Sequence, residues 1–315
     1  MTELKLKAVF RPDGHTQSLR DGTVRPRTFE IEYEDVPVLI QAFRRMVRGL
    51  EFDICEMAIT TYICAKAYGK RFTAIPVFPA RVFHHGAILY NTRAGIQSPK
   101  DLEGRKVGVH RGYTVTTGVW IRSILQHQYG VDLNKITWLL SGDEHVAEYR
   151  APANVIPLEK GKTLEDILAS AEIPAVVNIE MEHPDVKPLI PNPVEAGFEA
   201  LRSSGHYPIN HTVVVKDELL DAHPDLAADI FNAFVEAKRS YVERLRNGQI
   251  ATPSKTDGRY KRVMEITGAD PLPYGIDANR RMIEAVIQYA GEQGIISRPL
   301  TMEELFARGT HGLVG

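Results

Sequence analysis

The 315-residue chain has few cysteines, no long apolar run and no excess of one charge. Its two cysteines do not suggest a disulfide framework, and no stretch approaches the roughly 18 consecutive apolar residues of a transmembrane helix. Lys and Arg (38) nearly balance Asp and Glu (40), so the composition does not indicate a nucleic-acid or membrane partner. Residues 1–11 lack the apolar core and cleavage site of a secretory signal. We therefore expect a cytoplasmic protein.

The residues that are present suit a globular α/β protein, because 43% are hydrophobic and 25% are charged. Strand-like and helix-like segments alternate along the chain. Strands are expected at 4–10, 29–33, 52–57, 72–78, 86–91, 106–109, 136–140, 175–179 and 212–215. Helices are expected at 36–49, from Thr60 or Thr61 to Gly69, and at 116–129, 163–170, 224–246, 278–289 and 302–306, with a short one capped at Ser98 and a Pro-rich loop at 183–193.

This alternation predicts mostly parallel sheets covered by helices. Two such blocks followed by a helical tail indicate two lobes, with crossings near 83–92 and 207–215. The predicted first lobe is 1–92 plus 208–315, and the second is 93–207. Since ligands of open α/β sheets bind at the carboxyl ends of the strands, we expect a small anion to bind in an interlobe cleft.

The segment 52–62 carries the first candidate site, where a strand ends and a helix begins. Glu56 stands near the strand end, where an acid or base would be useful. The free N–H groups of the helix, with the hydroxyls of Thr60 and Thr61, would form a carboxylate cradle. The alternative is that one threonine only caps the helix and that Glu56 is a solvated or paired carboxylate.

The segment 74–85 carries the second candidate site, in which two prolines stiffen the chain next to Arg81 and the pair His84–His85. Arginine binds carboxylates in a bidentate manner, and histidine exchanges a proton near neutral pH. The alternative is that adjacent histidines on a strand point to opposite faces, so that at most one faces a given cleft.

The segment 110–120 reads as a second anion cradle, built from Tyr113, Thr114, Thr116 and Thr117 between a strand and a helix. It lacks the Walker pattern, and capping by Thr114 or Thr116 would explain one hydroxyl. At the second crossing, His211 could face the cleft, although such a histidine is more often structural. No histidine or cysteine spacing typical of a metal site occurs, so we expect no metal.

These segments resemble the 4,5-dihydroxyphthalate decarboxylase family, which is similar in fold to type-2 periplasmic solute-binding proteins. The matching stretches are FDICEM at 52–57, AIPVFPAR at 74–81, GVWIR at 118–122, PINHTVV at 208–214, DPLPYG at 270–275, EQG at 292–294, RPL at 298–300 and EELF at 303–306. The resemblance spans nearly the whole chain.

The resemblance implies loss of CO2 from a hydroxylated aromatic acid without a cofactor. Arg81, Thr60 and Thr61 would then anchor the carboxylate, His85 or His211 would protonate the ring carbon, and Glu56 would deprotonate or orient the phenol. The alternative is a solute-binding protein that closes on a ligand without chemistry, because one fold serves both.

Three departures from the family pattern fall at strand ends. His15 and Gln17 stand where the family carries arginines, residues 111–116 replace its Glu-Tyr-Gln-Met-Thr turn, and residues 178–180 replace its Arg-Ala-Pro-Ser stretch. His15 is therefore a candidate substrate contact. Fewer arginines favour a substrate with less negative charge than a phthalate, such as a hydroxylated aromatic or heteroaromatic monoacid. The sequence leaves the number of subunits of the protein open, and a homo-oligomer is one possibility.

Overall fold

The computed structural model describes residues 4–315. Residues 1–3, which belong to the N-terminal segment 1–11 that we do not expect to be a secretory signal, lie outside the described residues. Within that range the chain forms two compact units. Unit 1 contains the described residues up to Arg81, Ile209–Glu284 and Leu300–Gly315, and unit 2 contains Val82–Pro208 and Ala285–Pro299. The predicted lobes, with boundaries at 92/93 and 207/208, stay a prediction.

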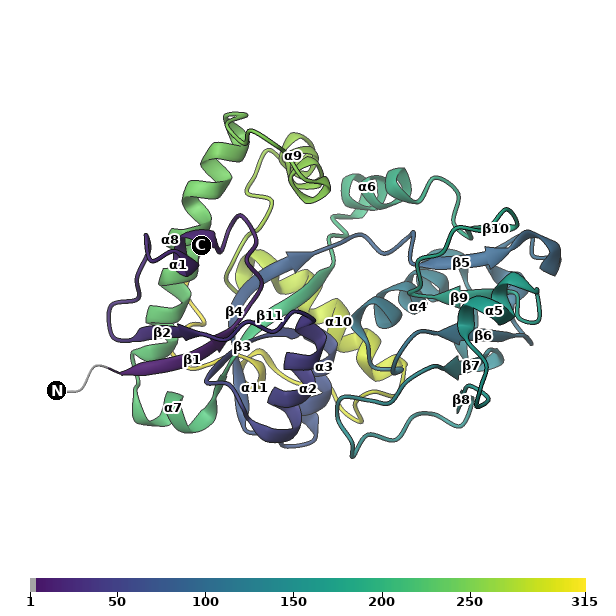
Figure 1. Cartoon of the computed structure of the whole chain (residues 1–315), viewed down its shortest axis with the longest axis horizontal. Helices are drawn as coiled ribbons and strands as arrows, with labels where there is room; N and C mark the ends of the chain where they lie inside the picture. The colour runs from purple at the N-terminus through teal and green to yellow at the C-terminus, as the bar shows by residue number, and fades with distance from the viewer. Residues whose placement is uncertain (1–3) are drawn as a thin grey trace. The chain divides into compact units, whose positions relative to one another are not determined.

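Unit 1 is built on a five-stranded sheet in the order β2-β1-β3-β11-β4 (Figure 1). Strand β1 pairs in parallel with β2 and β3, whereas β11 is antiparallel to both β3 and β4. The central strand β3 is buried along its whole length. The bounds are β1 Lys5–Val9, β2 Glu30–Tyr33, β3 Ile54–Ala58, β4 Phe72–Arg81 and β11 Ile209–Lys216.

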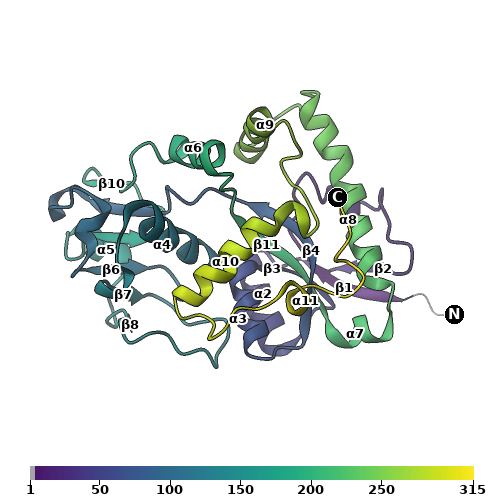
Figure 2. The same ribbon diagram turned by 180° about the vertical axis from the view of Figure 1, so that it is seen from behind.

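The helices of unit 1 pack on this sheet through apolar side chains. Helix α2 (Leu39–Gly49) buries Phe43, Met46 and Val47 at helical spacing and contacts β3, as does α3 (Ile59–Ala67). A bridge between Ala74 and Phe306 holds the segment after α11 (Met302–Leu305) beside β4 (Figure 2). The other helices are α1 Gln17–Arg20, α7 Asp217–Ala222, α8 Leu226–Arg246 and α9 Lys255–Thr267.

Unit 2 is built on a six-stranded sheet in the order β10-β5-β9-β6-β7-β8. Strands β9, β6, β7 and β8 are parallel, and β5 is antiparallel to its neighbours β10 and β9. The elements are β5 Ile88–Asn91, β6 Lys106–Val109, β7 Thr137–Leu140, β8 Val155–Pro157, β9 Ala175–Val177, β10 Val186–Pro188, α4 Thr116–Tyr129, α5 Leu164–Ala169 and α6 Pro193–Ser204, with short 3-10 helices at Thr92–Ala94, Pro99–Leu102 and Leu133–Lys135.

The last long helix, α10 (Arg280–Glu292), follows a 3-10 turn at Asp277–Asn279 and contributes its first residues to unit 1 and its remainder to unit 2. No helix of the described residues is long and apolar enough to cross a membrane.

The predicted α/β class with mostly parallel sheets is confirmed. The bounds of β6 and α4 match the prediction. Two local predictions are wrong. The N-cap of α3 is Ala58, so Thr60 and Thr61 lie inside its first turn. The expected loop at 183–193 contains β10 and the start of α6, which Pro193 can open because its fixed φ suits a first helical position.

Candidate functional site

The carboxylate of Glu56 is buried in unit 1, with only 1% of the residue exposed. Strand β3 supplies Glu56 and β11 supplies His211, and the antiparallel register sets Val213 opposite Glu56 and His211 opposite Ala58. Residues two apart on a strand share a face, so Glu56 and His211 project on the same side of the sheet as diagonal neighbours.

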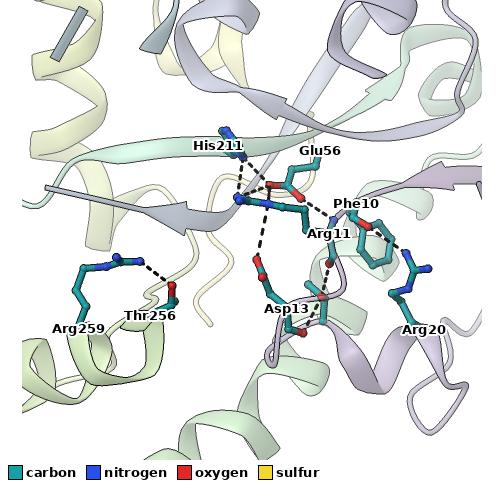
Figure 3. A network of polar contacts seen from close by, with 9 residues as sticks. Phe10, Arg11, Asp13, Arg20, Glu56, His211, Thr256 and Arg259 are labelled. Carbon is teal, nitrogen blue, oxygen red and sulfur yellow. Dashed lines mark hydrogen bonds and ion pairs between the residues drawn. The ribbon is translucent and has the colours of Figure 1, made fainter. Parts of the chain in front are cut away.

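Figure 3 shows Glu56 held between His211 and Arg11, which follows the end of β1. The backbone N–H of Arg11 donates to Oε2 of Glu56 at 2.9 Å, and its Nε and Nη2 donate to Oε1 at 3.2 and 3.1 Å. The Nδ1 of His211 lies 2.5 Å from the same Oε1. Asp13 lies 3.8 Å from Nε of Arg11, so two carboxylates flank one guanidinium.

These contacts decide the charge of Glu56. Burial by itself raises the pKa of a carboxyl group, but the charge of Arg11 and the hydrogen bonds from His211 and Arg11 lower the pKa of Glu56 to about 2. Glu56 is therefore ionised at neutral pH. A carboxylate so close to Nδ1 of His211 accepts that proton, which fixes the ring orientation and leaves Nε2 as the outward nitrogen.

The Nε2 of His211 is the accessible end of this pair. The His211 side chain is 14% exposed, and among the residues that the structure describes no hydrogen-bond partner is found for its Nε2. The ring stands edge-on to Phe43, with centroids 5.2 Å apart. Glu56 and Nη2 of Arg11, 2.5 and 3.2 Å from Nδ1, therefore hold the inner edge of the ring, and Nε2 is left to contact a bound molecule.

Arg81 ends β4 in unit 1 and is buried, with 2% exposure. Its Nη2 donates to Oδ1 of Asn279, whose amide in turn donates to the carbonyl oxygens of Pro273 and Gly275 at 2.9 and 2.7 Å. Arg81 therefore ties the end of β4 to the loop that carries the DPLPYG motif.

The remaining predicted residues of unit 1 are also buried. Thr60 and Thr61 have no exposed surface. His15 is 1% exposed and stands edge-on to Tyr241, and its Nε2 has no hydrogen-bond partner among the described residues. Burial lowers the pKa of His15, so its imidazole is neutral at pH 7.

His85 belongs to unit 2 and lies in a turn after β4 rather than on a strand, so the prediction of opposite strand faces for His84 and His85 is wrong. Both rings are buried. The Nε2 of His85 is 3.1 Å from Oε1 of Gln128, and its Nδ1 has no partner in the described part of the chain. Burial lowers the pKa of His85, only partly opposed by Gln128.

The predicted second cradle in unit 2 holds a carboxylate of the protein itself. The backbone N–H groups of Tyr113 and Thr114 and the hydroxyl of Thr114 all donate to the carboxylate of Glu144. The N-cap of α4 is Val115, so the alternative of capping by Thr114 or Thr116 is wrong. Thr116 is buried and Thr117 half-buried in the first turn of α4.

The structure thus gathers Glu56, His211 and the unpredicted Arg11 in unit 1, and Tyr113, Thr114 and the unpredicted Glu144 in unit 2. Whether the two groups line one crevice stays a prediction. The described residues hold no cluster of three His, Cys, Asp or Glu suited to a metal ion. Unit 1 also has a cavity of about 620 Å³ near the start of β4, at the end of this strand that is opposite to Arg81. Thr73 is among the residues that line it, and none of the predicted site residues does.

The chain is similar in sequence to two proteins named 4,5-dihydroxyphthalate decarboxylase. The protein of Comamonas testosteroni is 29% identical over 327 residues, which cover 97% of this chain and 97% of the relative. The protein of Pseudomonas putida is 32% identical over 177 residues, which cover 52% of this chain and 68% of the relative. No family model matches the chain.

Solved structures with a similar fold include a periplasmic aliphatic sulphonate binding protein, SsuA of Escherichia coli. Its TM-score is 0.55 at 13% identity, over 97% of this chain and 92% of that protein. The desulfurization enzyme DSZB has a TM-score of 0.54 at 12% identity, over 98% of this chain and 97% of that one. A Candida albicans protein described as having the generic periplasmic binding protein fold has a TM-score of 0.52 at 13% identity, over 100% of this chain and 99% of that one. Identities this low show the fold alone.

Proposed function

Since the chain belongs to the 4,5-dihydroxyphthalate decarboxylase family, we propose that it is a decarboxylase that releases CO2 from a hydroxylated aromatic carboxylic acid. The substrate would be 4,5-dihydroxyphthalate or a related monoacid, and the reaction would need no organic cofactor. The observation that carries the chemistry is the pair of the buried Glu56 and the partly exposed His211, with Nε2 of His211 free of any partner in the described residues.

Decarboxylation of such an acid needs a proton donor at the ring carbon that bears the carboxylate. Ionisation of a phenol ortho or para to that carbon raises its electron density. His211, protonated on both nitrogens, would donate the Nε2 proton to this carbon, and a new C–H bond forms. The bond to the carboxylate then breaks, its electron pair restores the aromatic ring, and CO2 leaves. Solvent returns a proton to Nε2.

Glu56 fits the supporting part of this step. It stays ionised because of its low pKa, and it accepts the Nδ1 proton of His211 at 2.5 Å. A hydrogen bond at Nδ1 sets the direction in which Nε2 points. Arg11 offsets the burial of the carboxylate from the opposite side. We assign Glu56 to orienting His211 rather than to removing the phenol proton, because a carboxylate of such low pKa is a weak base.

His85 is the less favoured donor because burial lowers the pKa of its ring and because its Nε2 is already in contact with the amide oxygen of Gln128, which accepts a hydrogen bond. Arg81 remains our candidate for the substrate carboxylate, together with Thr60 and Thr61, and His15 for a further substrate contact. These four assignments rest on the family resemblance and on the residues' place in unit 1.

The test is CO2 release by the wild type, His211→Gln and the matched variant His85→Gln, with 4,5-dihydroxyphthalate and a set of hydroxybenzoic and pyridine acids. We expect His211→Gln to lower kcat by about 10²–10⁴-fold, the range for loss of a general acid, and to leave KM within a few-fold. A larger loss for His85→Gln would reverse the assignment. Tight binding of an acid by the wild type with no CO2 from any of them would favour a solute-binding protein instead.

A further inference from the structure

Three donors converge on the carboxylate of Glu144 at the start of α4. We call them the carboxylate cradle: the backbone N–H groups of Tyr113 and Thr114 and the hydroxyl of Thr114. Tyr113 donates to Oε1 of Glu144, while Thr114 donates to Oε2 from its backbone at 3.2 Å and from its hydroxyl at 2.6 Å. Both oxygens of one planar carboxylate are therefore matched by donors from the turn that comes just before the 14-residue helix α4.

The backbone next to the cradle leaves room for this carboxylate. A Cβ atom on Gly112 would lie 2.5 Å from Oε2 of Glu144, so a side chain at this position would collide with the carboxylate. Glu144 itself comes from the irregular segment between β7 and β8, and its side chain is only half-buried. It reaches the cradle from a segment without regular structure, whereas the cradle is joined to a buried strand and helix.

A buried cation with a spare donor lies against the same turn. Arg122 is fully buried; its Nη2 donates to the carbonyl oxygen of Tyr113 at 2.6 Å, and its Nε to Gln293 at 2.8 Å. Its guanidinium lies 3.8 Å from the centroid of the Tyr113 ring. The Nη1 has no partner in the described residues and points at the first turn of α4, where a Cβ on Gly118 would lie only 2.9 Å away.

Burying a guanidinium with one N–H unpaired is costly unless the site gains from its charge. Arg122 therefore brings a buried positive charge with one unused donor to the turn that carries the cradle. A carboxylate that a ligand brings in place of Glu144 would meet two backbone N–H donors, one hydroxyl donor and the positive charge of Arg122 nearby.

We propose that Glu144 is a resident ligand of the carboxylate cradle, and that a small carboxylic acid displaces it to bind there. The inference rests on the proposed function and deepens it, because it makes the cradle an alternative to Arg81 as the position that holds the carboxylate of the aromatic acid. Glu144 competes as an intramolecular ligand at high effective concentration, so it weakens binding of every external carboxylate and sets a threshold of affinity that the true substrate must exceed.

Three variants test this: Glu144→Ala, which empties the cradle, Glu144→Gln, which keeps the shape without the charge, and the control Glu148→Gln, which removes an exposed charge from the same segment. Titration calorimetry with benzoate should show affinity at least about tenfold higher for Glu144→Ala than for the wild type, as expected when a charge-assisted competitor is lost. Glu144→Gln should fall between them, and Glu148→Gln should match the wild type.

Acetate provides a second readout that does not depend on an aromatic ring. The Glu144→Ala variant should have a lower Tm than the wild type, and acetate should raise this Tm more than it raises the Tm of the wild type or of Glu148→Gln. If Glu144→Ala does not fold, Glu144→Gln still permits both measurements. Adding Thr114→Val to Glu144→Ala should remove the gain in benzoate affinity.

The proposal is overturned if folded Glu144→Ala or Glu144→Gln binds benzoate no more tightly than the wild type, or if acetate gives no selective rise in Tm. Failure of the proposed function would look different. In that case the variants would bind benzoate and respond to acetate as described, but neither they nor the wild type would release CO2 from any aromatic acid.

Discussion

Replacing Glu56 by Gln isolates the electrostatic contribution of the buried carboxylate at the centre of unit 1. The amide keeps the shape and an acceptor oxygen, but it loses the charge that pairs with Arg11 and His211. Glu56 has a pKa of about 2 in place of the ordinary 4.5. At 1.36 kcal/mol for each pH unit, this difference corresponds to about 3 kcal/mol of folding free energy at neutral pH.

The pH dependence follows from the direction of this shift. A carboxyl whose pKa is lower in the folded state stabilises the fold fully above its unfolded pKa of about 4.5, and the contribution disappears as the pH falls towards about 2. The free energies of unfolding of the wild type and Glu56→Gln should therefore differ by about 3 kcal/mol at pH 7. The gap should narrow below pH 4.5.

Urea denaturation followed by circular dichroism between pH 7 and the lowest pH at which both proteins fold measures this gap. Glu51→Gln is the matched control, because Glu51 pairs with Arg45 at 2.7 Å on the surface, where such a pair contributes about 1 kcal/mol or less. The reasoning is refuted if Glu56→Gln loses no more stability than Glu51→Gln at pH 7, or if the gap stays constant below pH 4.5.

Two further predictions concern contacts between distant segments of unit 1. Gly275 has φ of +98°, and a Cβ there would lie 2.4 Å from the carbonyl oxygen of Leu313, whereas Gly69 has φ of +71° with no atom within 4 Å. Gly69→Ala should lower the free energy of unfolding by about 1–2 kcal/mol, and Gly275→Ala should lower it clearly more. Equal losses of stability for the two variants in thermal unfolding would contradict the steric argument. Tyr62→Phe should cost about 1–3 kcal/mol in urea denaturation, because the Tyr62 hydroxyl donates to the Leu305 carbonyl oxygen and accepts from the Ala74 N–H at 3.1 Å; no loss would mean that water or rearrangement replaces both bonds.

The parts of the fold that could be predicted from the sequence are those with local signals. Helix α4 ends at Tyr129 because Gly130 takes a left-handed conformation, with φ of 65°, and glycine adopts it without strain. Helix α9 begins with a capping box of Ser254 and Asp257, which is an equally local signal. The sequence therefore contains a start signal for α9, although no helix is predicted there.

Helix α3 shows where local signals mislead. All seven residues from Ile59 to Ala65 are buried, so polar and apolar positions do not alternate in a way that marks its ends. The two threonines suggested a cap, but β3 runs directly into the helix at Ala58. Thr60 and Thr61 are therefore buried in the first turn of α3 and do not cap it.

The partners in the candidate sites could not be read from the sequence, because they depend on strand register and on distant segments. Arg11 reaches Glu56 only because β1 and β3 pair in parallel, which sets Val9 beside Cys55. Glu144 lies about thirty residues beyond the turn that it contacts, and no motif connects them. The residue types predicted an anion cradle, but they did not indicate that Glu144 of the same chain would occupy its donors.

The position of β11 has a consequence for synthesis of the chain on the ribosome. This strand lies between β3 and β4, yet it is made more than a hundred residues after them. Until residue 216 has emerged, the nascent chain carries two apolar strands whose facing edges have no partner, a state that invites pairing with other chains. Val82–Pro208 is continuous, so most of unit 2 is available to fold while unit 1 still waits for its missing strand.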